Sequence, residues 1–284
     1  MAIRINVGSR VIGWRVPRVH TQRVISQLGW REPAISVVIP ALNEAKNLPI
    51  VLPRIPKWVR EVILVDGCST DDTVTVARRL RPDIRVIEQE GKGKGAALQT
   101  GFKAATCDII VMLDADGSTD PAEIPAFVDA LLAGADFAKG SRFLKGAGTA
   151  DMPLYRKLGN WGFVAIVRLL FGGHYSDLCY GYNAFWKHVI AQLNLDGNGF
   201  EIETMMNVRA LKAGFKVTEV PSFEDKRRYG ESRLRTFPDG WRVLRTIIDE
   251  FTRRDRKPYT RALHDRHTQP ASLFDYVAGE RVSD

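Results

Sequence analysis

Two aspartates in the middle of the chain are the residues best suited to chemistry. Asp114 and Asp116 belong to a triplet that directly follows the apolar run Ile109–Leu113, which has the composition of a buried strand. In an extended segment residues i and i+2 point the same way, so we expect the two carboxylates to converge. Facing carboxylates repel each other unless a cation lies between them. Because Mg²⁺ is typically held by one or two carboxylates together with substrate phosphates, the pair predicts a divalent metal and a nucleoside diphosphate.

An Asp-X-Asp triplet is also typical of a solvated turn, and its position decides between the two interpretations. Ligands of an open α/β sheet bind beyond the carboxyl ends of its strands, where this triplet is expected to lie. Two other expected strand ends carry acidic residues as well, Glu44 and Asp66. The glycine-rich loop 91–95 could receive an anion, but it lacks the spacing and the terminal Ser or Thr of a P-loop. The pattern therefore favours a metal and diphosphate site that is not that of a P-loop NTPase.

The elements that must position these residues follow an α/β pattern that begins at Ile35. Short β-branched runs alternate with segments long enough for a helix, which predicts a mostly parallel sheet flanked by helices. The expected strands are Ile35–Pro40, Glu61–Gly67, Ile84–Gln89, Asp108–Asp116, Asp136–Arg142 and Lys216–Phe223. The expected helices begin near Asn43, Asp71 and Lys92, and later ones span Pro121–Ala133, Leu154–Phe171, Glu201–Ala213 and Phe237–Phe251.

Composition and charge limit the classes of partner. The chain has 284 residues, of which 45% are hydrophobic and 26% charged, as in an ordinary globular protein. Its net charge of +8 is concentrated at the two ends, with +5 in residues 1–32 and +6 in residues 226–257. A nucleic-acid binder usually carries its basic residues on a recognition element. The distribution favours an anionic membrane surface or a phosphorylated substrate, and no nucleic acid.

Three parts are expected along the chain. Residues 1–33 form an N-terminal extension, 34–252 a catalytic domain and 253–284 a polar, basic C-terminal tail. The sequence contains no run of about 18 apolar residues, so we expect no spanning helix, and no signal segment is expected either. Three cysteines match no disulfide or metal pattern, which suits a reducing compartment. We therefore expect a cytoplasmic protein, peripheral to the inner face of the cell membrane, and a homo-oligomer is compatible with the sequence.

Eight short motifs occur in a fixed order between residues 35 and 250. They are 40–44 (PALNE), 65–73 (VDGCSTDDT), 91–97 (GKGKGAA), 114–118 (DADGS), 140–142 (GSR), 177–185 (DLCYGYNAF), 200–203 (FEIE) and 227–234 (RRYGESRL). This ordered set resembles glycosyltransferase family 2. Within that family it is similar to the dolichol-phosphate (polyprenol-phosphate) mannosyltransferase branch, which also includes glucosyltransferases. The order of the motifs is far more specific than any one of them.

The resemblance implies a GT-A (Rossmann-like) fold, a sugar-nucleotide donor, Mg²⁺ or Mn²⁺ as cofactor, and inversion at the anomeric carbon. By motif position, the nucleoside pocket would be lined by Pro40, Leu42, Glu44, Val65 and Asp66. The diphosphate would meet Asp114, Ala115, Asp116 and Ser118, with Asp114, Asp116 and Ser118 also at the metal. The phosphates would be held by Arg142, Arg227 and Arg233, and the catalytic residues would be Asp116, Arg142 and Arg227. Because Leu42, Ser118 and Arg233 differ from the residues of many relatives, the donor stays open between GDP-mannose and UDP-glucose.

The acceptor determines which further residues are needed. A phosphate acceptor such as polyprenyl phosphate is largely dianionic at pH 7, so it needs positive charge but no general base. Arg142 and Arg156 are the candidates for that charge. An acceptor hydroxyl needs a carboxylate base instead, for which Asp177, Glu201 and Glu203 are available. The leading hypothesis is metal-dependent transfer of a hexose to polyprenyl phosphate, and the alternative is a soluble family 2 enzyme that acts on a glycan or small metabolite.

The expected helix Leu154–Phe171 is the most apolar segment of the chain. Its apolar residues, with basic residues beside them, could lie among lipid headgroups while a prenyl chain enters the bilayer. A core helix packed under the sheet has the same composition. The sequence leaves both interpretations open, since they can apply to different faces of the helix.

Overall fold

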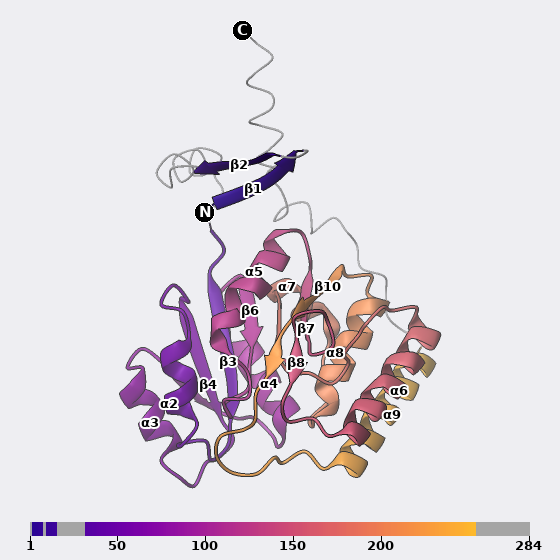
Figure 1. The fold of residues 1–284 in the computed structure, drawn as a ribbon. Coiled ribbons are helices and arrows are strands. Elements are labelled where there is room, and N and C mark those ends of the chain that lie inside the picture. The colour runs from indigo at the N-terminus through magenta and orange to yellow at the C-terminus, as the bar shows by residue number, and fades with distance from the viewer. Residues whose placement is uncertain (1, 8–9, 16–31, 254–284) are drawn as a thin grey trace. The chain divides into compact units, whose positions relative to one another are not determined.

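The computed structural model describes residues 2–7, 10–15 and 32–253 (Figure 1). The described elements fall into two units, of which the first holds the antiparallel pair β1 (Ala2–Val7) and β2 (Arg10–Arg15) and the second holds β3 through α9. The expectation of no regular element before Ile35 is therefore wrong. Apolar residues alternate with polar ones at positions 3 to 7, which is the period of a strand. Apart from Arg253, the predicted C-terminal tail lies outside the described residues.

The second unit is built on a seven-stranded sheet with the order β10-β7-β9-β6-β3-β4-β5. Every neighbouring pair in this sheet is parallel except those that β9 makes with β6 and β7. The predicted mostly parallel α/β sheet is confirmed. The strands are β3 (Ile35–Ala41), β4 (Glu61–Asp66), β5 (Arg85–Glu88), β6 (Ile109–Met112), β7 (Phe137–Ser141), β9 (Asn183–Trp186) and β10 (Val217–Pro221).

Helices cover the sheet (Figure 1), and two short strands pair beside it. The α-helices are α2 (Leu48–Val51), α3 (Thr73–Leu80), α4 (Lys94–Ala104), α5 (Ile124–Leu132), α6 (Leu154–Phe171), α7 (Lys187–Leu193), α8 (Glu201–Lys212) and α9 (Thr236–Thr252). The shorter elements are η1 (Leu52–Arg54), η2 (Pro121–Glu123), β8 (Gly148–Thr149) and β11 (Phe223–Glu224). In the described part of the chain, none of these helices is both long and apolar enough to cross a membrane.

The main core lies between the sheet and its helices and depends on a close approach of α4. A Cβ atom added at Gly101 would lie only 2.4 Å from the Val38 side chain and 2.9 Å from that of Val65. A glycine here therefore lets the helix backbone rest directly on β3 and β4. A second cluster joins α6, α8 and α9 through Val167, Val208, Val243 and Ile247.

The functional residues lie at or just beyond the ends of strands. At β6, the strand ends earlier than the sequence predicted. That strand ends at Met112, so Asp114 and Asp116 lie in the loop that follows. The expected strand to Asp116 is too long, because pairing with β3 and β9 stops at Met112. The strand β9 was not expected either. All four of its residues are buried, so it lacks the alternation that marks a strand in a sequence.

Candidate active site

The two aspartates of the loop after β6 each contact a different cation. One carboxylate oxygen of Asp114 lies 2.7 Å from the Lys94 ammonium. One oxygen of Asp116 lies 3.3 Å from the guanidinium of Arg227. Asp116 is also oriented by Ser118, whose backbone N–H and hydroxyl donate to it at 3.0 and 2.7 Å. The expected repulsion between the two carboxylates is thus moderated by two positive side chains from distant parts of the sequence.

Lys94, the first residue of α4, links Asp114 to a third carboxylate. Its ammonium donates to Glu203 on α8 at 2.8 Å and lies 5.7 Å from the centre of the Phe200 ring. Burial alone would lower the pKa of the Lys94 ammonium, but Asp114 and Glu203 outweigh it and raise that pKa. Lys94 is therefore a charged residue of the site. The sequence pattern indicated only that the glycine-rich loop containing Lys94 could receive an anion, and no role for the lysine itself.

Arg227 links the loop after β6 to the end of β3. Its guanidinium forms an ion pair with Glu44, and its Nε donates to the carbonyl of Tyr229 at 2.7 Å. The second carboxylate oxygen of Glu44 accepts a hydrogen bond from Asn47 at 2.6 Å. Asn47 in turn pairs with the backbone N–H and carbonyl of Tyr229, both at 3.1 Å. These contacts fix the segment after β11 above the carboxyl ends of the central strands.

The connected cluster has an excess of negative charge. Four carboxylates, those of Glu44, Asp114, Asp116 and Glu203, share two cations, so two negative charges remain. Burial raises the pKa of Asp114 to about 6, and the neighbouring carboxylates of Asp116 and Glu203 add to that effect against the attraction of Lys94. One divalent cation would balance this excess.

The carboxylates of this cluster suit a Mg²⁺ or Mn²⁺ ion that is also bound by the phosphates of a substrate. Among the described residues, no three His, Cys, Asp or Glu side chains gather into a complete metal centre. Mg²⁺ is usually bound by one or two carboxylates, with phosphate oxygens and water as its other ligands. Asp114 and Asp116 supply such a pair. The Ser118 hydroxyl, predicted as a third metal ligand, instead holds Asp116.

The predicted nucleoside pocket lies at the ends of β3 and β4. One carboxylate oxygen of Asp66 accepts from the N–H of Ser69 at 3.1 Å, whereas the other is buried and has no hydrogen-bond partner in the described part of the chain. A buried acceptor without a donor is costly, so this oxygen fits an N–H or hydroxyl of a ligand. Pro40 and Leu42 are half-buried beside it, and the Leu42 carbonyl accepts from Arg233 at 3.4 Å.

Two of the predicted pocket and diphosphate residues present no side chain to a ligand. Val65 is fully buried and faces Gly101 in the core. Ala115 is buried between the two aspartates, with 3% of its surface exposed. Only their backbones are placed to take part, because both side chains are buried in the protein interior.

Arg142 and Asp177 form a separate buried ion pair. The guanidinium donates to both oxygens of Asp177, at 2.7 and 2.9 Å, and to both oxygens of Glu224 at 3.1 Å. It also stacks on the Tyr180 ring, 4.7 Å from its centre. Burial would raise the pKa of Asp177, but the charge and hydrogen bonds of Arg142 hold it below its ordinary value. The arrangement does not support Arg142 as a phosphate ligand or Asp177 as a base.

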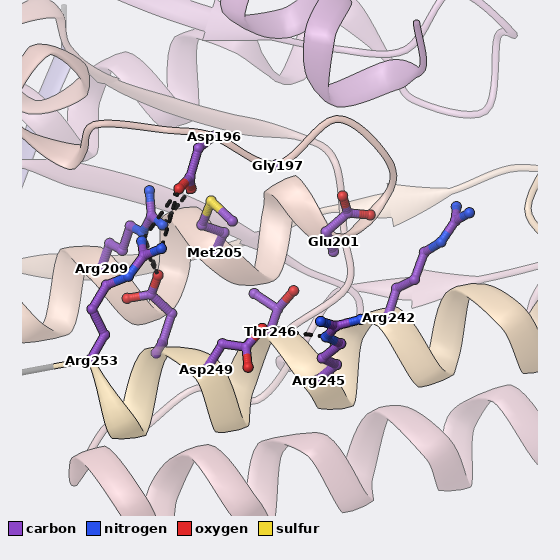
Figure 2. A pocket seen from close by; sticks show the side chains of 11 residues that line it. Asp196, Gly197, Glu201, Met205, Arg209, Arg242, Arg245, Thr246, Asp249 and Arg253 are labelled. Carbon is purple, nitrogen blue, oxygen red and sulfur yellow. Dashed lines mark hydrogen bonds and ion pairs between the residues drawn. The ribbon is translucent and has the colours of Figure 1, made fainter.

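The other acceptor candidates lie in three different settings. Arg156 near the start of α6 donates to the Thr236 hydroxyl at 3.0 Å and to the Leu234 carbonyl at 3.4 Å, so it anchors the segment that carries Arg227 and Arg233. Glu203 faces Lys94. Glu201 lines a cavity of about 310 Å³ between α8 and α9 (Figure 2).

The charged lining of that cavity is largely paired within the protein. The buried Arg209 side chain contacts Glu250 at 2.7 Å, and Arg253 lies 3.3 Å from Asp196. Figure 2 shows Asp196, Arg209 and Arg253 at one end of the cavity and Arg242 at the other. The cavity therefore has no evident excess of charge for a ligand.

The glycine-rich loop before α4 contacts protein backbone rather than open space. Added Cβ atoms at Gly93 and Gly95 would lie 2.3 and 2.2 Å from the carbonyl oxygens of Asn198 and Gly197. The Gly95 N–H donates to the Asn198 carbonyl at 2.8 Å. These glycines therefore allow the segment before α8 to pack on the start of α4, which brings Lys94 and Glu203 together. A lysine between two glycines at a helix start was the available signal for Lys94.

Comparison with known proteins identifies the family. The sequence model of glycosyl transferase family 2 matches residues 36–193, which is more than half of the chain. The chain belongs to this family. It is 34% identical to a dolichol-phosphate mannosyltransferase of Pyrococcus furiosus over 71% of the chain, although the match spans only 59% of that protein. It is 33% identical to a polyprenol monophosphomannose synthase of Mycolicibacterium smegmatis over 70% of the chain and 80% of that protein.

Solved structures agree on the fold. A glucosyl-3-phosphoglycerate synthase from Mycobacterium tuberculosis, in complex with Mn²⁺, UDP and glucosyl-3-phosphoglycerate, gives a TM-score of 0.61 at 21% identity and covers 85% of this chain and 88% of its own. The same enzyme with Mg²⁺ and UDP also gives 0.61, at 23% identity, over 85% of this chain and 87% of its own. The predicted GT-A fold and family resemblance are confirmed, and the protein is a glycosyltransferase.

Gly181 offers a direct test of the Lys94 cluster. A Cβ atom at this position would lie 2.8 Å from the Glu203 carboxylate, 2.9 Å from the Lys94 ammonium and 3.1 Å from the Asp114 carboxylate. We expect Gly181→Ala to displace these groups and to lower kcat/KM for sugar transfer about tenfold, the equivalent of about 1.4 kcal/mol in transition-state stabilisation. Steady-state kinetics measure the effect. Gly159→Ala is the matched control, because nothing lies within 4 Å of the added atom. Equal rates for the two variants would contradict the assignment.

Proposed function

We propose that the protein transfers a hexose from a sugar nucleotide to a polyprenyl phosphate, with Mg²⁺ or Mn²⁺ and with inversion at the anomeric carbon. One observation carries the choice of acceptor: two of the three predicted bases are held in ion pairs, and the third points into a different cavity. Glu203 contacts the Lys94 ammonium, Asp177 lies in a buried ion pair, and Glu201 faces the cavity between α8 and α9. An acceptor hydroxyl would need a carboxylate free to take its proton, whereas a phosphate dianion does not.

The donor end of the reaction is supported by the arrangement of charge. Asp66 presents a buried unpaired oxygen to the nucleoside. Asp114 and Asp116 would hold the divalent cation, which supplies positive charge to the diphosphate as it leaves. Arg227 already contacts Asp116 and lies on the same loop as Arg233, so both guanidiniums can reach phosphate oxygens without a large movement. Such preplaced charges stabilise a leaving group without reorganisation during the reaction.

The bond changes balance without an added base. An acceptor phosphate oxygen attacks the anomeric carbon on the face opposite the donor diphosphate, and the bond from that carbon to the diphosphate oxygen breaks. The products are the glycosyl lipid phosphate and the nucleoside diphosphate. Because the acceptor is a lipid, the enzyme would act at a membrane surface, and we expect this to be the cytoplasmic face. The relatives named for dolichol and polyprenol phosphates support the same acceptor class.

A matrix of donors and acceptors tests the proposal. GDP-mannose or UDP-glucose with labelled sugar is incubated with a short-chain polyprenyl phosphate, the corresponding polyprenol or no acceptor, in Mg²⁺, Mn²⁺ or EDTA. We expect label in the organic phase with one donor, only with the phosphorylated lipid, and not in EDTA. Donor binding with transfer only to water-soluble hydroxyl acceptors would overturn the proposal. That outcome would require Glu203 or Asp177 to leave its ion pair, or Glu201 to turn from its cavity towards the site.

A further inference from the structure

Residues 176–181 lie in the protein interior although they form neither a helix nor a strand. We refer to them as the buried segment. A loop that is removed from water needs other partners for its backbone N–H and C=O groups. Here many of these partners are side chains from distant parts of the chain, namely Lys139, Arg142, Asn160, Asn183, Asn207 and Glu219. Side chains, rather than a strand pairing, therefore hold the buried segment in place.

Lys139 is the least expected of these side chains. It lies in β7 with 0% of its surface exposed. Its ammonium donates to the carbonyl of Gly140 at 2.7 Å and to that of Tyr180 in the buried segment at 3.2 Å. It also lies 5.7 Å from the centre of the Tyr180 ring. Both acceptors are uncharged, whereas a fully buried lysine is usually paired with a carboxylate.

The surrounding charges do not compensate for the burial of Lys139. Burial lowers the pKa of its ammonium, and Arg142 lowers it further, whereas the more distant charges of Asp177, Glu203 and Glu219 act in the opposite direction. The resulting pKa lies below that of a lysine in water, so the folded protein disfavours the charged form. A methionine would fill a similar volume without this cost. Such departures from the rules of a stable core are expected at functional sites.

The peptide that Lys139 bonds leads directly into the candidate active site. The residue after Tyr180 is Gly181, which is buried. A Cβ atom added there would lie within 3.1 Å of the charged groups of Lys94, Asp114 and Glu203. The Gly181 backbone is therefore packed against the Lys94 cluster. A shift of the Tyr180 carbonyl would move this backbone relative to the three charged groups.

The contact between β7 and the buried segment is also close. The Gly140 N–H donates to the Tyr182 carbonyl at 2.9 Å, and a Cβ atom added at Gly140 would lie only 2.4 Å from that carbonyl oxygen. One ammonium thus joins the carbonyls of two chain segments that already touch. The distance between β7 and the Tyr180 peptide is set by Lys139 and by the absence of a side chain at Gly140.

We propose that Lys139 is a positioning residue for sugar transfer: by holding the Tyr180 carbonyl against β7 it fixes Gly181, and through Gly181 the geometry of the Lys94 cluster. Lys139 is fully buried, so it acts through this peptide and not by contact with a substrate. The inference rests on the proposed function for the metal and the sugar nucleotide that the cluster receives, and is independent of the acceptor.

Lys139→Met tests the proposal, because methionine keeps the length of the side chain but has neither charge nor hydrogen-bond donor. We expect kcat/KM for sugar transfer to fall about tenfold, since small misplacements of catalytic groups have effects of this size. The dissociation constant of GDP-mannose or UDP-glucose in Mg²⁺, measured by calorimetry without acceptor, should rise. The free energy of unfolding in urea should be unchanged or higher, because a costly buried charge is gone.

Lys212→Met is the matched control. The Lys212 ammonium also donates to two backbone carbonyls, those of Glu250 and of Arg253, the latter at 3.0 Å, but it joins the ends of α8 and α9. We expect this variant to change the free energy of unfolding and to leave kcat/KM unchanged. If Lys139→Met behaves in the same way, or does not fold, Lys139 is a structural residue and the proposal is wrong.

A double variant tests the route through Gly181. If Lys139 acts by placing this residue, Lys139→Met/Gly181→Ala should have a kcat/KM within about threefold of the less active single variant, because both changes disturb one contact. Losses that multiply would overturn this route. A crystal structure of Lys139→Met provides a readout that depends on no substrate: Gly181 and Lys94 should be displaced, and wild-type positions for both would overturn the proposal. If the wild type binds donor in Mg²⁺ but does not label polyprenyl phosphate, the proposed acceptor fails while calorimetry and the crystal structure still decide the role of Lys139.

Discussion

Replacing Asp116 by alanine is expected to reduce sugar transfer by about 10²–10³-fold, which is the loss typical of removing one preorganised electrostatic group. Asp116 is a carboxylate of the proposed metal pair, and it also contacts Arg227 at 3.3 Å. Its loss would therefore weaken the cation and release the guanidinium at the same time. The measurement is kcat/KM for the donor at saturating Mg²⁺, compared with the wild type.

Two further variants sharpen this prediction. Asp116→Asn can still accept the hydrogen bonds of Ser118 but has no charge, so we expect a loss close to that of the alanine variant if charge is what matters. Asp129→Ala removes an exposed carboxylate on α5 and serves as the control with unchanged activity. Activity of Asp116→Ala within about threefold of the wild type would exclude a metal-binding role, since that is less than 1 kcal/mol.

The fold was largely predictable because its strands carry strong local signals. Runs such as Ile35–Ala41 and Glu61–Asp66 are β-branched and end in turn residues, and the alternation with helices fixes a parallel sheet. The elements missed were those that depend on pairing. The four-residue β9 is stabilised by Phe185, whose ring packs against Phe102 and Phe137, a contact between residues far apart in the chain. No short stretch of the sequence shows this contact.

The candidate site was predictable in its acidic half and less so in its basic half. Strand-end position alone selected Asp66, Asp114 and Asp116, because the carboxyl ends of parallel strands meet at one edge of the sheet. The partners of the arginines and lysines depend on long-range packing instead. Lys94 reaches Glu203 across 109 residues, and Arg142 reaches Asp177 rather than a solvent-facing phosphate site. A motif gives the residue types but not which carboxylate each cation will meet.

Replacing Arg142 by methionine is expected to lower the free energy of unfolding by about 3–5 kcal/mol, because it leaves the buried Asp177 carboxylate without its cation. Urea unfolding followed by circular dichroism measures the change. The double variant Arg142→Met/Asp177→Leu should recover much of the loss, since an apolar pair of similar volume often replaces a buried ion pair at little cost.

The ion pair between Arg142 and Asp177 also predicts how stability depends on pH, and this dependence distinguishes a structural role of Arg142 from a ligand-binding one. The pKa of Asp177 is lowered in the folded protein, so its contribution is fully present above the ordinary pKa of an aspartate and is lost as the pH falls through the lower, folded value. The double variant lacks this group and should lose less stability over that acidic interval than the wild type. If Arg142→Met is instead as stable as the wild type at neutral pH and only the KM for the acceptor rises, the guanidinium is a phosphate ligand, and the ion pair with Asp177 is exchanged for the substrate during turnover.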